Sequence, residues 1–475
     1  MGKLRNTKIV ATIGPASSSK ENLKKLIDAG LNVARLNFSH GTHEDHAKVI
    51  KSIRELNEEH GYQVAMLADL QGPKLRVGDI ENGGVELVKG ENIIITSDEV
   101  IGTKERVYLS YEHFAQDVKP GERILMDDGK LILTVISSNG KNEVTAQVIH
   151  GGILKPRKGV NLPNTKISQP SLTEKDQRDL QFIIENDLDW VGLSFVRQAN
   201  DIKVLKKIIH QNHRDIRVIA KVEKPEAIAD LDNIIEVTDA VMIARGDLGV
   251  EIPMEEVPLI QKSIIQKCLH LAKPVIVATQ MMESMIDNPS PTRAEVTDVA
   301  NAVLEGADAV MLSGETSVGK HPSLVVKAMV KIINEAETHD SIYNREQPPT
   351  NVSSERFIAN SICYNAVRLN QRTNASAIVT MSFSGYTAFK VSSHRPATNI
   401  FVFTGNKKLM NTLSLVWGVK VFYYDKFVST DDTITDIKQI LKREGHVKTN
   451  DLMINIASMP ITDRGMANML KLTKI

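Results

Sequence analysis

The chain has 475 residues, and its 58 Lys and Arg residues are balanced by 58 Asp and Glu residues. With 42% hydrophobic and 24% charged residues, the composition is that of a globular protein and excludes a disordered or fibrous one. A formal net charge of zero argues against nucleic acid as the main partner, because surfaces that bind nucleic acid carry a basic surplus. At about 150 residues per domain, the length predicts about three domains.

Two cysteines, Cys268 and Cys363, are too few for a disulfide framework, and their spacing matches no metal or redox motif. The first residues lack the apolar core of a signal peptide, and no run approaches the ~18 apolar residues of a membrane-spanning helix. We therefore expect a cytoplasmic protein with no membrane partner.

Short β-branched runs, most of them followed by an amphipathic helical segment, indicate βα units around a parallel sheet. The expected strands are 7–13, 33–38, 64–69, 190–196, 217–222, 240–244, 275–279 and 309–313. Eight units favour a closed (β/α)₈ barrel over an open doubly wound sheet, which more often has about five or six strands.

Residues 72–169, between the third and fourth of these strands, have a different pattern. Alternating runs are separated by the turn pairs Asn82-Gly83, Asp128-Gly129 and Asn139-Gly140, which favour hairpins. We expect an inserted β-barrel lid domain here. Ser171 with Glu174 predicts a capping box where the chain re-enters the barrel.

A polar segment at 338–354, which contains Pro348-Pro349, suggests a domain boundary. Further strands are expected at 377–382, 399–404, 419–423 and 451–457, with helices between them, so a second α/β domain follows. The predicted division is a barrel of residues 1–71 and 170–345, a lid of residues 72–169 and a C-terminal α/β domain of residues 346–475.

Polar residues stand at the carboxyl ends of most of the expected barrel strands, where barrel enzymes have their active sites. In chain order they are Arg35, Asn37, Ser39, His40, Asp69, Ser194, Lys221, Glu223, Arg245, Asp247, Thr279, Ser313 and Glu315. Taken singly, residues such as Ser39 or Thr279 are as well explained as helix caps. Lys221 and Glu223 are poor caps, and charged groups at a barrel rim are costly unless they pair or bind a charged ligand.

Two carboxylates on adjacent strand ends, Glu223 and Asp247, suit a hard divalent cation such as Mg²⁺. Lys221 lies on the same face of its strand as Glu223, and Arg35 and Arg76 add positive charge. A metal ion together with several cationic side chains is the arrangement that phosphoryl transfer needs, so a phosphorylated substrate is indicated.

These residues carry a close resemblance to one family. The segments RLNFSHG (35–41), DLQGPKLR (69–76), AKVE (220–223), ARGDLGVEI (244–252), ATQMMESM (278–285) and MLSGET (311–316) occur in the order of the pyruvate kinase motifs. The chain resembles pyruvate kinases from Thr7 to Lys474, and its Gly-Pro-Lys form resembles the bacterial type. The resemblance implies the barrel, an inserted β domain that closes over it, and a C-terminal regulatory domain.

The implied reaction is transfer of the phosphoryl group of phosphoenolpyruvate to ADP, which gives ATP and pyruvate in the last step of glycolysis. Glu223 and Asp247 would ligate Mg²⁺ or Mn²⁺, and Lys221 would stabilise the transition state. Gly246, Asp247 and Thr279 would hold the substrate carboxylate. Arg35 would bind the phosphoryl group. The nucleotide would be bound by His40, Arg76 and Lys158. A water network near Thr279, Ser313 and Glu315 would protonate the enolate. Some relatives have Lys where Val318 stands, so one nucleotide contact is in doubt.

In relatives, residues that match Asn37, Ser39, Asp69 and the carbonyl of Leu70 form a monovalent-cation site. K⁺-dependent members have Glu where this chain has Lys74, and an ammonium there supplies the charge that K⁺ otherwise brings. We therefore expect activity without K⁺.

Residues Ser382, Ser384, Gly385, Tyr386 and Thr387 match the effector phosphate loop of the family. The Gly-Pro-Lys form suggests AMP or a sugar monophosphate as the allosteric effector, although an ordinary βα loop has the same composition. The family also suggests a homotetramer. Two other functions stay open, a Mg²⁺-dependent lyase or mutase that acts on pyruvate enolates and a metabolite sensor without catalysis.

Overall fold

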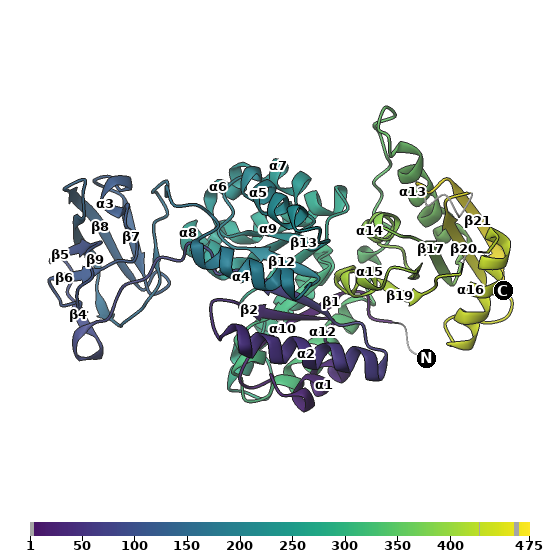
Figure 1. Ribbon diagram of the computed structural model, residues 1–475, viewed down its shortest axis with the longest axis horizontal. Coiled ribbons are helices and arrows are strands. Elements are labelled where there is room, and N and C mark those ends of the chain that lie inside the picture. The colour runs from purple at the N-terminus through teal and green to yellow at the C-terminus, as the bar shows by residue number, and fades with distance from the viewer. Residues whose placement is uncertain (1–3, 427, 460–464) are drawn as a thin grey trace.

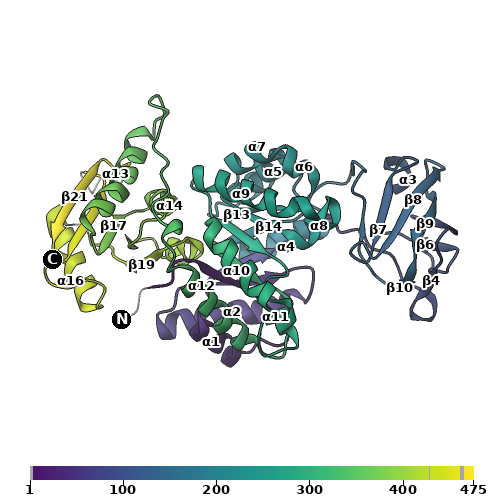
Figure 2. The same ribbon diagram turned by 180° about the vertical axis from the view of Figure 1, so that it is seen from behind.

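A computed structural model describes residues 4–426, 428–459 and 465–475. Three units follow one another along the long axis of the molecule (Figure 1), with the barrel in the middle, a β-rich unit at one end and an α/β unit at the other. The view from behind shows the same order (Figure 2). In the described ranges, no helix is long and apolar enough to cross a lipid bilayer.

The central unit is a closed barrel of eight parallel strands in the order β1-β16-β15-β14-β13-β12-β3-β2. The strands are β1 (Lys8–Ile13), β2 (Val33–Asn37), β3 (Ala65–Asp69), β12 (Trp190–Leu193), β13 (Arg217–Val222), β14 (Ala240–Ala244), β15 (Val275–Ala278) and β16 (Ala309–Leu312). All eight strands that the sequence predicts are present, and the (β/α)₈ barrel is confirmed. The domain limits given above stay a prediction.

Helices surround these strands. They are α1 (Lys20–Ala29), α2 (His43–His60), α4 (Glu174–Glu185), α5 (Ala199–Gln211), α6 (Pro225–Ala229), α7 (Leu231–Val237), α8 (Arg245–Glu251), α9 (Val257–His270), α10 (Arg293–Glu305), α11 (Gly314–Ser317) and α12 (Pro322–Ala336), with 3₁₀ turns η2 (Met254–Glu256), η3 (Glu283–Ile286) and η4 (Asp340–Ile342). The predicted cap of α4 is wrong by two residues. Thr173, not Ser171, accepts from the Asp176 N–H, and Asp176 closes the capping box instead of Glu174. The shorter Asp side chain reaches back to the cap as well as Glu does.

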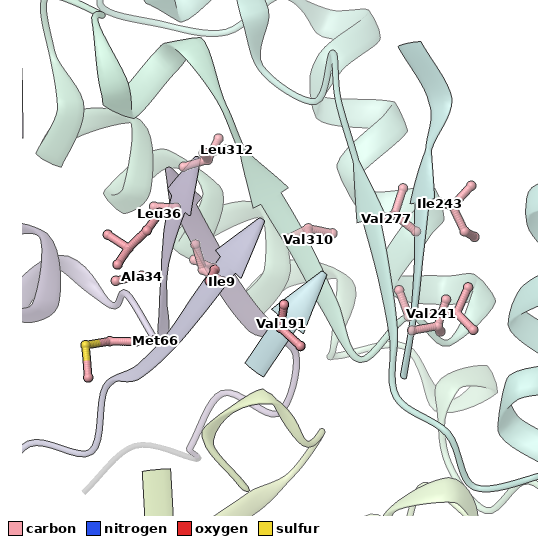
Figure 3. Packing of buried hydrophobic residues seen from close by; sticks show 14 of the residues in the cluster. Ile9, Ala34, Leu36, Met66, Val191, Val241, Ile243, Val277, Val310 and Leu312 are labelled. Carbon is pink, nitrogen blue, oxygen red and sulfur yellow. The ribbon is translucent and has the colours of Figure 1, made fainter. Parts of the chain in front are cut away.

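Successive residues of the barrel strands point to opposite faces, so the strands contribute to two apolar cores. Side chains such as Ile9, Leu36 and Val310 pack outward against the helices (Figure 3). Val10, Val33 and Ile219 point inward and fill the barrel. Leu415 and Trp417 of the C-terminal unit also belong to these two cores, Leu415 to the inner one and Trp417 to the outer one.

The lid comprises β4 (Val85–Leu87), β5 (Asn92–Thr96), β6 (Arg106–Tyr108), β7 (Arg123–Met126), β8 (Leu131–Ser138), β9 (Glu143–His150), β10 (Gly152–Leu154) and β11 (Val160–Asn161), with α3 (Phe114–Asp117) and η1 (Glu81–Gly83). Six strands form one sheet in the order β11-β7-β8-β9-β5-β6, and β4 pairs with β10. Single bridges from Arg76 to Gly159 and from Val77 to Leu109 connect one segment to both edges of the six-stranded sheet, which closes it into a barrel-like unit.

Two of the three predicted hairpins are present. Asp128-Gly129 joins β7 to β8, and Asn139-Gly140 joins β8 to β9. The third prediction is wrong. Asn82-Gly83 lies in a 3₁₀ turn before β4, which pairs with β10 and not with its chain neighbour.

The C-terminal unit has a five-stranded sheet in the order β19-β18-β17-β20-β21. Its elements are α13 (Phe357–Thr373), β17 (Ala377–Met381), α14 (Tyr386–Ser393), β18 (Asn399–Thr404), α15 (Lys407–Thr412), η5 (Leu413–Leu415), β19 (Val419–Tyr423), α16 (Thr430–Arg443), β20 (Leu452–Ala457) and β21 (Met469–Lys474). The antiparallel edge strand β21 is absent from the sequence prediction, although Leu470 and Leu472 alternate there with Lys471 and Thr473.

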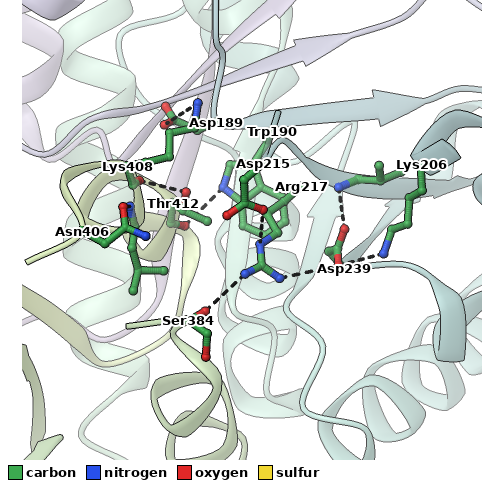
Figure 4. Close-up of polar contacts among 12 residues, drawn as sticks. Asp189, Trp190, Lys206, Asp215, Arg217, Asp239, Ser384, Asn406, Lys408 and Thr412 are labelled. Carbon is green, nitrogen blue, oxygen red and sulfur yellow. Dashed lines mark hydrogen bonds and ion pairs between the residues drawn. The ribbon is translucent and has the colours of Figure 1, made fainter. Parts of the chain in front are cut away.

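The C-terminal unit contacts the amino ends of the barrel strands (Figure 4). Arg217 at the start of β13 donates to the Ser384 carbonyl over 3.2 Å, and the Trp190 indole at the start of β12 donates to the Thr412 carbonyl over 3.2 Å. Lys408 donates to the carbonyls of Asp187 and Leu188. This unit therefore lies at the amino ends of the barrel strands. The candidate site residues lie at the carboxyl ends, on the opposite side of the barrel.

Candidate active site

The predicted residues of β2, β3 and β13 converge at the carboxyl ends of these strands. The Arg35 Nε atom donates to Asp69 Oδ2 over 2.7 Å, and the Lys221 ammonium lies 3.1 Å from Asp69 Oδ1 and 2.8 Å from Glu223 Oε1. Lys221 also donates to the Ser194 hydroxyl over 2.6 Å. Two cations and two carboxylates thus form one buried network.

Charge compensation sets the protonation of this network. Burial by itself would lower the pKa of Lys221, but the carboxylates of Asp69 and Glu223 raise it above its ordinary value. Burial would raise the pKa of Asp69, but Lys221 and Arg35 hold it below its usual range. Both groups are therefore charged at neutral pH.

Glu223 and Asp247 are the carboxylates that the sequence assigns to a metal. Burial raises the pKa of Glu223, and the nearby charge of Asp247 raises it further. Glu223 Oε2 accepts from the Phe195 N–H over 2.7 Å, while the Asp247 side chain is about one-third exposed. Within the described residues no group of three or more His, Cys, Asp or Glu side chains is placed to hold a metal. Two mutually repelling carboxylates fit Mg²⁺ or Mn²⁺, which complete their shells with substrate oxygens and water.

Thr279 and Gly246 meet where β15 and β14 end. The Gly246 N–H donates to Thr279 Oγ1 over 2.7 Å, and the Thr279 hydroxyl lies 2.6 Å from the Ala278 carbonyl. Thr279 has a φ of +69°, which is strained for a β-branched residue. The Gly246 N–H at the start of α8 therefore donates to the Thr279 hydroxyl, which an incoming carboxylate can displace.

Glu315 and Ser313 follow β16. Both Glu315 oxygens accept backbone N–H groups, from Ser313 over 2.6 Å and from Met282 over 3.2 Å. Burial raises the pKa of Glu315. The Glu315 carboxyl therefore fixes two active-site loops, while Ser313 lines an adjacent cavity.

That cavity, of about 910 Å³, opens beside the network and is lined by Thr12, Arg35, Asn37, His40, Lys48, Ser313 and Val318, among others. Burial and the charges of Arg76, Lys74 and Arg35 lower the pKa of His40, so its imidazole is neutral near pH 7. Val318 is 62% exposed at this cavity. The volume of the cavity is sufficient for a nucleotide, and its lining includes the cationic side chains Arg35 and Lys48.

The two lid cations contact lid groups and do not line this cavity. Arg76 donates to the Arg157 carbonyl over 3.1 Å, and Lys158 lies 2.8 Å from Asp127. The structure therefore brings His40 to the cavity but leaves Arg76 and Lys158 on the lid.

The residues of the predicted monovalent site lie at the ends of β2 and β3. Asn37 Oδ1 accepts the Ser39 N–H over 3.2 Å, and the Leu70 carbonyl accepts the Ser194 hydroxyl over 2.7 Å. Lys74 lies 3.8 Å from Asp247 Oδ1, so its ammonium lies beside one of the two carboxylates that the sequence assigns to a metal.

The predicted effector loop connects β17 to α14. Gly385 has a φ of +83° and donates to the Ser382 hydroxyl over 2.9 Å, and a Cβ there would lie 2.8 Å from Leu409. Thr387 Oγ1 lies 2.6 Å from Thr380 Oγ1. A cavity of about 600 Å³ borders the loop and is lined by Arg356, Ser382, Ser384, Tyr386, Thr387 and Lys426, among others. Arg356, which sequence reasoning missed, lies 4.1 Å above the ring of Tyr386.

Other partners were also missed from the sequence. Thr12 Oγ1 accepts from Arg35 Nη1 over 2.8 Å, and Lys224 pairs with Glu251 over 2.6 Å. Thr12 is the last residue but one of β1 and Lys224 directly follows Glu223, so position along the chain was the available signal for both.

Two family models match successive parts of the chain. Residues 4–326 match the family model of the pyruvate kinase barrel domain, and residues 360–473 match the model of the pyruvate kinase alpha/beta domain. The chain is 46% identical over 466 residues to the pyruvate kinase of Corynebacterium glutamicum, with 98% of this chain and 97% of that protein covered. It is 43% identical over 472 residues to that of Geobacillus stearothermophilus, with 98% of this chain and 80% of that protein covered.

A crystal structure of a pyruvate kinase from Cryptosporidium parvum superposes with a TM-score of 0.91 at 34% identity, and covers 99% of this chain and 96% of that one. Matches of this length and identity extend over the barrel, the lid and the C-terminal unit together. The chain therefore belongs to the pyruvate kinase family.

Proposed function

We propose that the chain transfers the phosphoryl group of phosphoenolpyruvate to ADP, which gives ATP and pyruvate, at the strand ends described above. The observation that carries the proposal is the network in which Lys221 and Arg35 lie among Asp69 and Glu223 beside a cavity of about 910 Å³. Cations held in place by carboxylates need no reorganisation when charge develops on the transferring group.

Arg35 and Lys221 hold the phosphoryl group and the enolate oxygen. Asp69 and Thr12 fix the guanidinium of Arg35 by hydrogen bonds of 2.7 and 2.8 Å, so it is oriented before substrate arrives. Glu223 and Asp247 hold Mg²⁺ or Mn²⁺, which supplies positive charge to the phosphoryl oxygens when bound. Thr279, Gly246 and Asp247 bind the substrate carboxylate, and the Thr279 hydroxyl gives up its contact with the Gly246 N–H.

The enolate is protonated by water that Thr279 and Ser313 hold, while Glu315 positions the Ser313 backbone. His40 contacts the nucleotide in the cavity. Arg76 and Lys158 reach the nucleotide phosphates when the lid closes, and Lys158 must leave Asp127 to do so. Val318 offers no charge to the nucleotide where some relatives have Lys.

Lys74 supplies the positive charge that K⁺ provides in relatives at the monovalent-cation site of Asn37, Ser39, Asp69 and Leu70. Its place beside Asp247 supports this proposal, because a fixed positive charge is already present at the phosphoryl-transfer site. The enzyme therefore works without K⁺.

The loop of Ser382, Ser384, Gly385, Tyr386 and Thr387 binds a phosphorylated effector, AMP or a sugar monophosphate. The adjoining cavity and the cations Arg356 and Lys426 support this assignment. We further propose that the protein is a cytoplasmic homotetramer. Light scattering would measure its mass in solution.

The test is ATP formation from phosphoenolpyruvate and ADP with and without Mg²⁺. Mg²⁺-dependent ATP formation is expected, and its absence would overturn the proposal. A lyase or mutase acting on pyruvate enolates would consume its substrate without ADP, and a sensor would bind phosphoenolpyruvate without turnover. The lid cations Arg76 and Lys158 favour the kinase over both, because neither alternative needs a nucleotide clamp.

A further inference from the structure

A buried ion pair lies next to the active site and takes no part in the steps above. Lys224 Nζ lies 2.6 Å from Glu251 Oε1, and the two side chains are only 7% and 1% exposed. Lys224 directly follows the metal carboxylate Glu223, and Glu251 lies one helical turn after Asp247 on α8. The pair therefore connects the end of β13, which Glu223 directly follows, to α8, which carries Asp247.

A side chain of the lid contacts this pair. Asn161, the last residue of β11, donates from Nδ2 to Glu251 Oε1 over 2.7 Å. The second oxygen of Glu251 is buried and has no hydrogen-bond partner among the described residues. Glu251 thus uses one oxygen for both Lys224 of the barrel and Asn161 of the lid.

The lid meets α8 at two further points. Gly129 in the β7–β8 turn faces Val250, and Lys74 lies 3.8 Å from Asp247. Both overall views place α8 on the side of the barrel nearest to the lid (Figures 1 and 2). Three contacts on one short helix make α8 the surface against which the lid rests.

Stability alone does not explain a buried Lys–Glu pair, because apolar residues of similar volume often serve as well or better. What an apolar pair cannot provide is an acceptor for Asn161. That residue lies three positions after Lys158, and the Arg76–Gly159 bridge ties the second lid cation to the same backbone. The position of Asn161 therefore sets the position of both cations.

We propose that Glu251 is a positioning residue, which holds the lid through Asn161 and so fixes the point about which the lid turns when it carries Arg76 and Lys158 to the barrel mouth. Lys224 neutralises the buried carboxylate and keeps it aimed at the lid. The role in ADP binding rests on the proposed function, whereas the control of lid position does not.

The test measures lid position and kinetics on the same variants. Spin labels on Lys141→Cys in the lid and Lys207→Cys on α5 report the lid-to-barrel distance, since both positions are exposed. Asn161→Ala removes the donor, and Asn161→Asp places a second carboxylate beside Glu251. The control Asn92→Asp adds the same charge to the exposed start of β5, away from the barrel.

We expect the distance distribution to broaden in Asn161→Ala, to broaden further in Asn161→Asp, and to stay as in the parent in Asn92→Asp. Glu251→Gln keeps an acceptor for Asn161 and should keep the parent distribution; because it leaves the buried Lys224 without its charge partner, circular dichroism must show that this variant is folded. The KM for ADP should rise about tenfold in Asn161→Ala, the loss typical of a hydrogen bond to a charged group, with the KM for phosphoenolpyruvate within about twofold.

Unchanged distances in both Asn161 variants would overturn the proposal. Equal rises of both KM values would overturn it too, because general loosening of the fold does not separate the two substrates. The distance measurement needs no turnover, so a parent protein that makes no ATP would refute the proposed function and leave the lid result to stand by itself.

Discussion

Replacement of Lys221 by Met should remove most of the turnover. The Lys221 side chain is 10% exposed and its ammonium lies 2.8 Å from Glu223 and 3.1 Å from Asp69, so it is a fixed positive charge at the strand ends. A charge about 4 Å from the oxygen on which negative charge develops contributes about 4 kcal/mol at an effective dielectric constant of about 20. That free energy corresponds to a loss of about 10³-fold in kcat.

The assay is steady-state ATP formation with saturating Mg²⁺ and ADP over a range of phosphoenolpyruvate concentrations. Lys331→Met, at an exposed position on α12, is the matched control and should keep the parent kcat. Breaking a buried pair costs about 3–5 kcal/mol, so circular dichroism must show that Lys221→Met is folded at the assay temperature. A folded Lys221→Met protein with kcat within about tenfold of the parent would refute the reasoning, because the charge would then contribute less than about 1.4 kcal/mol.

Three further predictions concern other parts of the chain. Replacement of K⁺ by tetramethylammonium should change the rate of ATP formation by less than about tenfold. Lys74→Glu should make that rate depend on K⁺, because it removes the charge that substitutes for the ion. A parent protein that needs K⁺ would contradict this prediction. Burial raises the pKa of Asp189 to about 6, with Lys408 acting in the opposite sense. The folded state therefore binds the proton more tightly than the unfolded state, and this contribution to stability is full below about pH 4 and is lost as the pH rises through about 6. In Asp189→Asn the urea-unfolding free energy should depend less on pH across that window, and an unchanged slope would contradict the assignment. Arg217→Met should keep the basal kcat within about twofold, since the side chain is remote from the chemistry, but should weaken the response of phosphoenolpyruvate saturation to AMP and glucose 6-phosphate. A full response would show that the contact with Ser384 does not couple the two sites.

The barrel and the convergence of its strand-end residues could be predicted because they depend on local pattern. Alternation in β-branched runs locates the strands, and a parallel barrel brings all their carboxyl ends together. Arg35, Asp69, Lys221 and Glu223 therefore meet as the order of the strands requires. Their roles in catalysis stay a prediction.

Contacts between distant segments could not be read in this way. Asn161 and Glu251 are 90 residues apart, and nothing in either segment indicates that the lid turns this face toward α8. β21 is a single run of six residues, and its assignment as a strand depends on its pairing with β20. At Thr173 the competing caps were two residues apart, and side-chain geometry decided between them.

Leu415 and Trp417 complete the two cores of the barrel, although they follow its last helix α12 by some 80 residues. A ribosome adds about 5–20 residues per second, so roughly 4–16 s pass between the synthesis of the last barrel helix and that of the residues that seal its base. During this interval the nascent barrel exposes apolar surface that the finished protein buries. We therefore expect the newly made chain to be most prone to aggregation after all eight strands have been synthesised, and truncation before Leu415 to leave a barrel that exposes this apolar surface.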